Sequence, residues 1–232
     1  MSYLEENLHT IKQEIELFCK AKNRDPAEIK LVAVTKTIDT ERINEVIDLG
    51  ISDIGENKVQ EVTTKYDSIK KGVVWHLIGH LQSNKVKYII DKVNLIHSVD
   101  SIALAKEISL RAGKISRTMD ILIQVNPADE ESKFGIAYDE TEDFVKEVAE
   151  LPNIRIRGLM TIAPFNEDLE KIRPYFRMMK EKFESLKSLK RENVTMEFLS
   201  MGMTGDYMVA LEEGANIVRI GTGIFGKRDY SK

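Results

Sequence analysis

The sequence has a single cysteine, Cys19, in 232 residues, and it has no long apolar run. One thiol cannot close an internal disulfide, and it cannot supply the thiolate cluster that structural zinc or an iron–sulfur centre needs. No stretch approaches the roughly 18 apolar residues of a membrane-spanning helix. The N-terminus MSYLEENLHTIKQEIELFC is acidic and amphipathic, unlike a signal sequence. These absences predict a soluble cytoplasmic protein.

An excess of basic charge is also missing. Lysine and arginine together number 34 against 38 aspartate and glutamate residues, which gives a formal net charge of -4. Such a chain has no overall basic field to hold a nucleic-acid backbone. Its 42% hydrophobic and 31% charged residues are enough to bury one large core. We therefore expect a small-molecule ligand, with no nucleic-acid and no membrane partner.

The first residues predict a helix. Apolar residues recur there at spacings of three and four, which is the pattern of one buried helical stripe: Leu4, Leu8, Ile11, Ile15 and Phe18. Pro26 interrupts the pattern, so the helix should end near Asn23–Pro26. No linker, low-complexity tract or repeat follows. We expect one domain, residues 1–232, in which the leading helix of residues 1–24 packs on the remainder.

Short β-type runs alternate with helical segments from there onward. The predicted strands are Leu31–Thr35, Asp53–Gly55, Val74–Gly79, Leu95–Ser98, Met119–Val125, Ile154–Met160, Thr195–Ser200 and Ile217–Ile220. Such alternation requires parallel strands, because each helix serves as a crossover. Eight units in about 200 residues predict an α/β fold of the (β/α)8 barrel type. An open doubly wound sheet is the alternative.

The chemistry of such a barrel lies where strands end and the next loops begin, so Lys36 is the first candidate. It follows the run LVAVT, in which no polar residue precedes Thr35. A lysine in a partly dry site has a lowered pKa, and its neutral amine can attack a carbonyl to form a Schiff base. The alternative is a lysine that reaches out to water from a strand end.

Two glycine-rich stretches, FLSMGMTGD and NIVRIGTGIFG, predict a phosphate cradle after the seventh and eighth strands. Gly221 and Gly223 permit close backbone approach, and Ser200 and Thr222 offer hydroxyls. Ordinary turn glycines are the alternative. The segment Thr204–Asp206 could equally cap a helix over Tyr207–Glu213, and we expect Asp206 to do mainly that.

Arg219 lies two residues before Gly221, so both point the same way on an alternating strand. A guanidinium inside a barrel needs an acceptor, which a ligand could supply. The alternative is structural pairing with Glu56 or Glu197.

His80 and Asn57 also follow predicted strands. Contact with a ligand is one role for them; a hydrogen-bonded core histidine and a helix-capping asparagine are the alternatives. His76 precedes His80 by four residues, but the segment reads as a strand and no third ligand stands nearby. We therefore assign no metal site.

The combined motifs resemble one family. They are AVTK, GENKVQE, WHLIGHLQSNK, VNPADEESKFG, IRGLMTIAP, LSMGMTGD and VRIGTGIFG, spread in this order over nearly the whole chain. Together they resemble the YggS/PROSC family, the pyridoxal phosphate homeostasis proteins. That resemblance implies a single-domain barrel of fold type III, similar to the N-terminal domain of alanine racemase, and a monomer.

The resemblance also implies roles for individual residues. Lys36 would carry pyridoxal 5'-phosphate as a Schiff base, and Arg219 would face the pyridine nitrogen. The phosphate would be held by Ser200, Gly221 and Thr222, and the cofactor lined by Asn57 and His80. Thr204 stands where we expect a serine, and it keeps the hydroxyl for any phosphate contact.

Arg219 bears on the choice of function. Its guanidinium can only donate, so a pyridine nitrogen facing it stays unprotonated and is a poor electron sink. The chain also ends soon after the last predicted strand, which leaves no room for the second domain of a two-base racemase. We expect a binder that buffers or supplies pyridoxal phosphate in vitamin B6 homeostasis, possible clients being enzymes that use it. The alternatives are a low-activity amino-acid racemase and a Schiff-base aldolase acting on a phosphorylated sugar.

Overall fold

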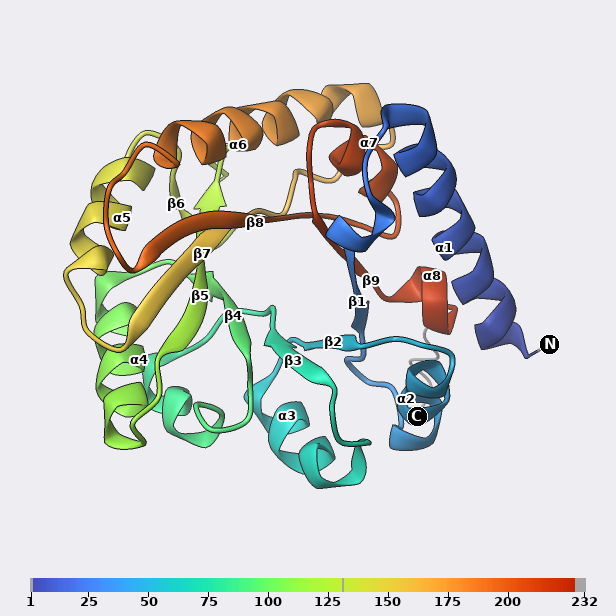
Figure 1. Cartoon of the computed structure of the whole chain (residues 1–232), viewed down its shortest axis with the longest axis horizontal. Coiled ribbons are helices and arrows are strands. Elements are labelled where there is room, and N and C mark those ends of the chain that lie inside the picture. The colour runs from blue at the N-terminus through green and yellow to red at the C-terminus, as the bar shows by residue number, and fades with distance from the viewer. Residues whose placement is uncertain (1, 131, 228–232) are drawn as a thin grey trace.

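The chain forms a closed barrel of parallel strands with helices around its outside (Figure 1). The computed structural model describes residues 2–130 and 132–227. The strands are β1 (Lys30–Val34), β2 (Asp53–Glu56), β3 (Val74–Leu77), β4 (Leu95–Val99), β5 (Met119–Asn126), β6 (Ile136–Ala137), β7 (Ile154–Met160), β8 (Val194–Met203) and β9 (Ile217–Ile220).

Helices fill most of the connections between these strands. The α-helices are α1 (Tyr3–Lys22), α2 (Thr40–Asp48), α3 (Val59–Lys65), α4 (Ile102–Lys114), α5 (Thr141–Ala149), α6 (Arg173–Leu186), α7 (Tyr207–Glu212) and α8 (Thr222–Phe225). Short 3-10 turns are η1 (Pro26–Glu28), η2 (Tyr66–Ser68), η3 (Ser83–Tyr88) and η4 (Leu169–Lys171).

Two pairings close the barrel. The strand β1 lies between β2 and β9, and β4 pairs with β5, so the eight predicted strands form a ring without a free edge. The predicted (β/α)8 barrel is therefore confirmed, and the open doubly wound alternative is wrong. The strand β6 was not predicted. It adds only two residues to the edge of β5, at Val125↔Ile136 and Asn126↔Ala137, and is too short to carry a pattern.

Two apolar cores stabilise the ring. The larger core lies between the strands and the surrounding helices, where Ile54, Leu77 and Ile96 are fully buried. The smaller core fills part of the barrel interior and comprises Val32, Leu95, Leu122, Met160 and Ile217. Polar residues occupy much of the remaining interior, and this division places the chemistry inside the ring.

The predicted leading helix is α1. Ser2 and Glu5 form a capping box at its start, and Asn23 ends it in the left-handed conformation (φ 53°). In Figure 1 α1 runs beside α7 and α8 at the outside of the barrel, and Asn7 Nδ2 donates to the carbonyl of Ile224 at 2.9 Å. The predicted domain of residues 1–232 includes positions 1, 131 and 228–232, which lie outside the described residues.

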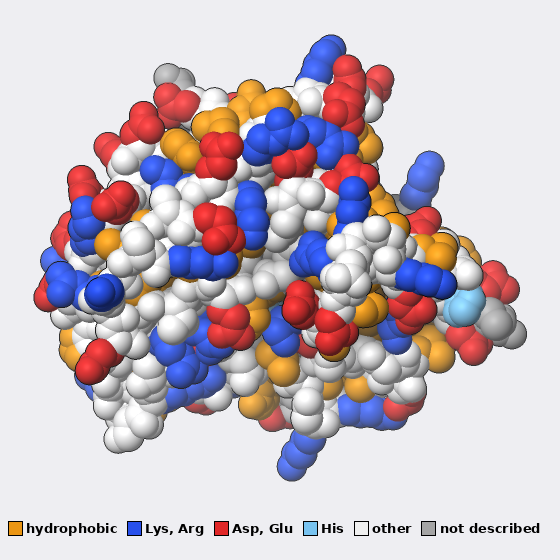
Figure 2. All heavy atoms as spheres, turned by 45° about the horizontal axis from the view of Figure 1, so that its top comes forward, with side chains coloured by type: hydrophobic (Ala, Val, Ile, Leu, Met, Phe, Trp, Pro, Cys, Tyr) orange, Lys and Arg blue, Asp and Glu red, His pale blue; other side chains and the backbone are white. Residues whose placement is uncertain are grey.

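The surface mixes charges of both signs. On the face in Figure 2, Lys and Arg side chains alternate with Asp and Glu side chains, and no large area of one sign stands out. Within the described part of the chain, no helix combines the length and the apolar character needed to cross a bilayer.

Candidate functional site

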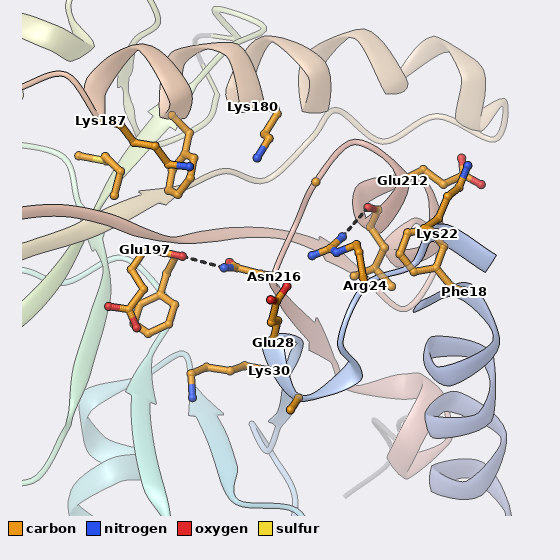
Figure 3. Close-up of a pocket in the computed structure, with 16 residues that line it drawn as sticks. Phe18, Lys22, Arg24, Glu28, Lys30, Lys180, Lys187, Glu197, Glu212 and Asn216 are labelled. Atoms are coloured by element: carbon orange, nitrogen blue, oxygen red, sulfur yellow. Dashed lines mark hydrogen bonds between the residues drawn. The ribbon is translucent and has the colours of Figure 1, made fainter. Parts of the chain in front are cut away.

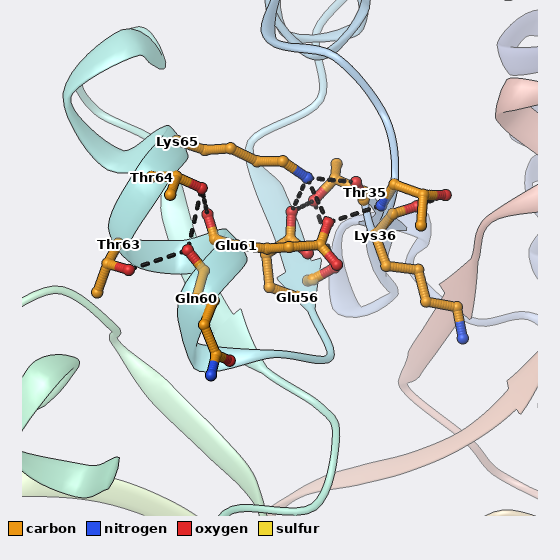
Figure 4. A network of polar contacts seen from close by, with 10 residues as sticks. Thr35, Lys36, Glu56, Gln60, Glu61, Thr63, Thr64 and Lys65 are labelled. Carbon is orange, nitrogen blue, oxygen red and sulfur yellow. Dashed lines mark hydrogen bonds and ion pairs between the residues drawn. The ribbon is translucent and has the colours of Figure 1, made fainter. Parts of the chain in front are cut away.

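Lys36 lies in the turn that follows β1, at the carboxyl end of the barrel. The neighbouring residue Thr37 has a positive φ of 64°, and Lys36 itself is half-buried. Two carboxylates fix the turn: Thr35 Oγ1 donates to Glu56 Oε1 at 2.7 Å, and the Thr37 amide donates to Glu61 Oε2 at 2.6 Å. In Figure 4 the Lys36 side chain extends away from these carboxylates. The turn therefore presents the amine away from its supporting contacts.

Lys65 joins these supporting contacts into one network. Its ammonium group donates to Glu56 Oε1 at 2.8 Å, to Glu61 Oε2 at 2.7 Å and to the carbonyl of Thr35 at 2.9 Å. Burial raises the pKa of Glu56. Burial would also raise the pKa of Glu61, but the hydrogen bonds from Lys65 and the Thr37 amide outweigh it and lower that pKa. None of these three residues was predicted to belong to the site as a network, although Glu61 and Lys65 stand at the i, i+4 spacing of a helical ion pair.

The predicted cradle forms beside the turn. A methyl group on Gly221 would lie 3.4 Å from Val34 Cβ, so the end of β9 touches the strand that leads to Lys36. Thr204 Oγ1 accepts the Gly223 amide at 3.2 Å and lies 3.2 Å from Thr222 Oγ1. Two hydroxyls and a glycine-rich backbone thus meet at one point on the carboxyl rim, which suits an anion.

Arg219 lies deeper, inside the barrel, and only 3% of its surface is exposed. It donates to Ser200 Oγ at 2.5 Å and to the carbonyl of Thr161 at 2.8 Å. Burial lowers its pKa to about 10, with the charge of Asp206 opposing, so the guanidinium is cationic at neutral pH.

The alternative partners of Arg219 are wrong. Glu56 pairs with Lys65, and Glu197 pairs with Arg157. The guanidinium is instead held by a hydroxyl and a carbonyl, both neutral. Ser200, predicted beside the phosphate, is fully buried, and its hydroxyl oxygen is hydrogen-bonded to Arg219 and to His97.

His80 is not a core histidine. Its side chain is 36% exposed, stacks on Phe134 with 3.8 Å between ring centroids, and places Nδ1 3.5 Å from Asp100 Oδ2. Burial raises the pKa of Asp100, with the contact to His80 opposing. Phe134 belongs to the loop after β5, so residues following β3, β4 and β5 meet at the same rim. Neither Phe134 nor Asp100 was among the predicted site residues.

Asn57 does not cap a helix, because the residue before α3 is Lys58. Its Oδ1 is buried without a hydrogen-bond partner among the described residues, and its backbone lies against Gly79, where an added Cβ would stand 2.3 Å from the Asn57 carbonyl oxygen. Asp206 does precede α7, but its carboxylate accepts the amide of Met203 at 2.5 Å and makes no capping hydrogen bond to α7. The predicted N-cap position of Asp206 is therefore confirmed, but its side chain does not form the capping hydrogen bond.

A hollow of about 700 Å³ lies elsewhere, at the opposite end of the strands (Figure 3). Lys30 at the start of β1 and Asn216 just before β9 line it, together with side chains of α1 and α6. Its cations are largely engaged: Lys180 and Lys187 pair with Glu184, and Arg24 donates to two carbonyls. This hollow does not include the predicted site. Within residues 2–130 and 132–227, no group of three or more His, Cys, Asp and Glu side chains could hold a metal ion.

Comparison with known proteins gives consistent matches. The alanine racemase N-terminal domain family matches residues 7–229. The chain is 44% identical over 226 residues to the pyridoxal phosphate homeostasis protein of Aquifex aeolicus, covering 97% of this chain and 98% of that protein.

Two solved structures have nearly the same fold. An unknown protein from Bifidobacterium adolescentis superposes with a TM-score of 0.90 at 34% identity, covering 96% of this chain and 94% of that one. PipY of Synechococcus elongatus, solved with pyridoxal phosphate bound, gives a TM-score of 0.84 at 30% identity, covering 96% of this chain and all of the other (100%).

Proposed function

Because the chain belongs to the alanine racemase N-terminal domain family and, within it, to the pyridoxal phosphate homeostasis proteins, we propose that it binds pyridoxal 5'-phosphate reversibly on Lys36. The amine would attack the cofactor's aldehyde, and water would leave as the Schiff base forms. The observation that carries the proposal is the position of Lys36 in the turn that directly follows β1. The last residue of β1, Val34, lies against Gly221 of the cradle.

The described residues fit this group. A phosphorylated aldehyde needs an amine at one side and an anion cradle at the other, and Lys36 and the Thr204–Thr222 pair offer both. Arg219 adds a buried cation, and its hydrogen-bond acceptors among the described residues are neutral groups. Asn57 adds a buried side-chain oxygen that accepts no hydrogen bond from the described residues. His80, stacked on Phe134, lies at the same rim.

Binding rather than turnover is favoured by Arg219. When bound, pyridoxal phosphate can stabilise a carbanion, and it does so best with a protonated ring nitrogen. A pKa of about 10 keeps Arg219 protonated at neutral pH, so it can donate to that nitrogen but cannot deliver a proton to it readily. The chain's residues therefore hold the cofactor with little support for racemisation.

Reduction with borohydride tests the covalent bond. The protein loaded with pyridoxal phosphate should absorb visible light, and after reduction peptide mass spectrometry should locate the added mass on Lys36. Lys36→Ala should abolish both signals, whereas Lys58→Ala, at a nearby exposed lysine, should keep them. A wild-type protein that takes up no cofactor would overturn the proposal. Substantial racemisation with deuterium uptake at the α-carbon of amino acids would favour the enzyme instead.

We further propose that the protein acts as a cytoplasmic monomer that buffers or supplies the cofactor to client enzymes. A client stripped of cofactor should regain activity faster with the loaded wild type than with an equal amount of spontaneously released cofactor. If the two rates agree, delivery by contact is wrong and buffering accounts for the result. Light scattering should give the mass of one chain.

A further inference from the structure

A continuous row of hydrogen bonds crosses the barrel interior from β2 to β9. Asp53 Oδ1 lies 2.9 Å from His76 Nε2, and His76 Nδ1 lies 2.8 Å from His97 Nε2. His97 Nδ1 lies 3.0 Å from Ser200 Oγ, which accepts from Arg219 at 2.5 Å. These five residues are between 0% and 5% exposed. We call them the interior row.

The two ends of the interior row have fixed polarity. Arg219 can only donate, because a guanidinium has no acceptor. Burial would raise the pKa of Asp53, but hydrogen bonds from His76 and Ser52 and the charge of Lys30 outweigh it, so that pKa is lowered and the carboxylate only accepts. A donor at one end and an acceptor at the other allow every intervening bond to run in one direction.

The middle of the row then has one fully satisfied arrangement. Ser200 accepts from Arg219, so its own hydrogen is available for His97 Nδ1. His97 donates from Nε2 to His76 Nδ1, and His76 donates from Nε2 to Asp53. Burial, with the charge of Arg219 adding to it, lowers the pKa of His97 well below its usual range, so this ring is neutral.

The reverse direction leaves a group unsatisfied. If His97 donated from Nδ1, Ser200 would accept twice, and among the described residues its hydroxyl hydrogen would have no acceptor. His76 would then need to donate from both nitrogens to His97 and Asp53 as a buried cation. Leaving a buried hydroxyl hydrogen without an acceptor destabilises the fold, which favours the forward direction.

We propose that His97, backed by His76 and Asp53, is a positioning residue for Arg219. By accepting the hydrogen bond of the Ser200 hydroxyl, His97 turns a lone pair of Ser200 Oγ toward the guanidinium of Arg219. This contact fixes the orientation of the guanidinium at the end of β9. The inference rests on the proposed function where it concerns the cofactor: the remaining N–H groups of Arg219 are held in place for the ring nitrogen. The two histidines touch no cofactor themselves.

Nitrogen-15 NMR of the histidine rings in the cofactor-free protein tests the direction of the row. His97 and His76 should each show a proton on Nε2 and none on Nδ1. The His97 signal should stay constant between about pH 5.5 and about pH 8.5, where an ordinary histidine titrates. A proton on Nδ1 of His97, or titration of His97 in that range, would overturn the proposal. This result does not depend on whether pyridoxal phosphate binds.

Variants test the consequence for the cofactor. His97→Phe keeps a ring but removes both hydrogen bonds, and it should release pyridoxal phosphate about tenfold faster and shift the visible band of the bound cofactor. His97→Gln can still accept from Ser200 and donate to His76, so it should restore much of both properties. Leu122→Ala, which disturbs the apolar interior without touching the row, should leave the band unchanged.

If His97→Phe and Leu122→Ala behave alike in release rate and spectrum, His97 is merely structural and the proposal is wrong. A wild type that binds no cofactor would defeat the proposed function alone, because the NMR measurement still decides the direction of the row.

Discussion

Lys65 and Glu56 form a buried ion pair, 2.8 Å between Nζ and Oε1, that also holds the carbonyl of Thr35 next to Lys36. The pair connects the end of α3 to β2 and to the turn after β1. A buried pair of this kind reveals its role when one partner is removed, because the other charge is left without compensation.

Lys65→Met should lower the free energy of unfolding by about 3 to 5 kcal/mol at neutral pH, since it leaves Glu56 buried and charged. Urea denaturation measures the loss. Lys70→Met provides the control: Lys70 pairs with Asp48 at the surface, and its loss should cost less than about 1 kcal/mol. Because Glu56 can take up a proton, the penalty of Lys65→Met should shrink as the pH falls. Equal losses in the two variants would contradict a supporting role for Lys65.

Asp53 should make stability depend on acid pH. Its pKa is lowered in the folded state, so its contribution is complete above the unfolded value of about 3.9 and is lost as the pH falls through the folded value. Asp53→Asn keeps an acceptor for His76 but cannot titrate. The urea midpoint of the wild type should therefore fall more steeply than that of the variant between about pH 5 and about pH 3. Parallel curves would show that Asp53 carries no such linkage.

Gly158 should tolerate no side chain. It lies in β7 with φ 149°, and an added Cβ would stand 1.8 Å from the carbonyl oxygen of Phe198 on β8. Gly158→Ala must push these strands apart, with a loss of at least about 2 kcal/mol in thermal or urea unfolding. At Gly205 an added Cβ meets nothing within 4 Å, so Gly205→Ala serves as the control and should be nearly neutral. Comparable stability of the two variants would refute the steric argument.

Thr204 should contribute its hydroxyl to the cradle. Its Oγ1 accepts the Gly223 amide and lies beside Thr222 Oγ1. In a titration with pyridoxal phosphate, Thr204→Ser should bind like the wild type, and Thr204→Ala should bind about tenfold more weakly. Thr63→Ala, on the exposed side of α3, controls for general effects. Unchanged affinity in Thr204→Ala would remove Thr204 from the site.

The barrel could be predicted from sequence because its signals are local. A run such as Met119–Val125 consists largely of β-forming residues, so the strand can be recognised without knowledge of its neighbours. Once the parallel strands close into a barrel, the first and last strands, β1 and β9, must lie side by side. This is why the contact between Val34 and Gly221 follows from order alone.

The polar interior could not be predicted in the same way. The contact between His76 and His97 joins residues of β3 and β4 that are 21 positions apart in the sequence, and it depends on the orientation of each ring. The same holds for Ser200: its hydrogen bonds to Arg219 and His97 could not be predicted from its place in the motif. Composition and spacing do not fix such orientations, because burial and the competing acceptors decide them.

The contacts of α1 also bear on how the protein emerges from the ribosome. Lys12 donates to the carbonyl of Leu49, so the contact of α1 with the region of α2 can form early. Asn7 donates to the carbonyl of Ile224, 217 residues later in the chain, so the side of α1 that packs on α8 stays uncovered until Ile224 has been synthesised. At about 5 to 20 residues per second, that exposure lasts on the order of ten seconds or more, long enough for a chaperone to engage it.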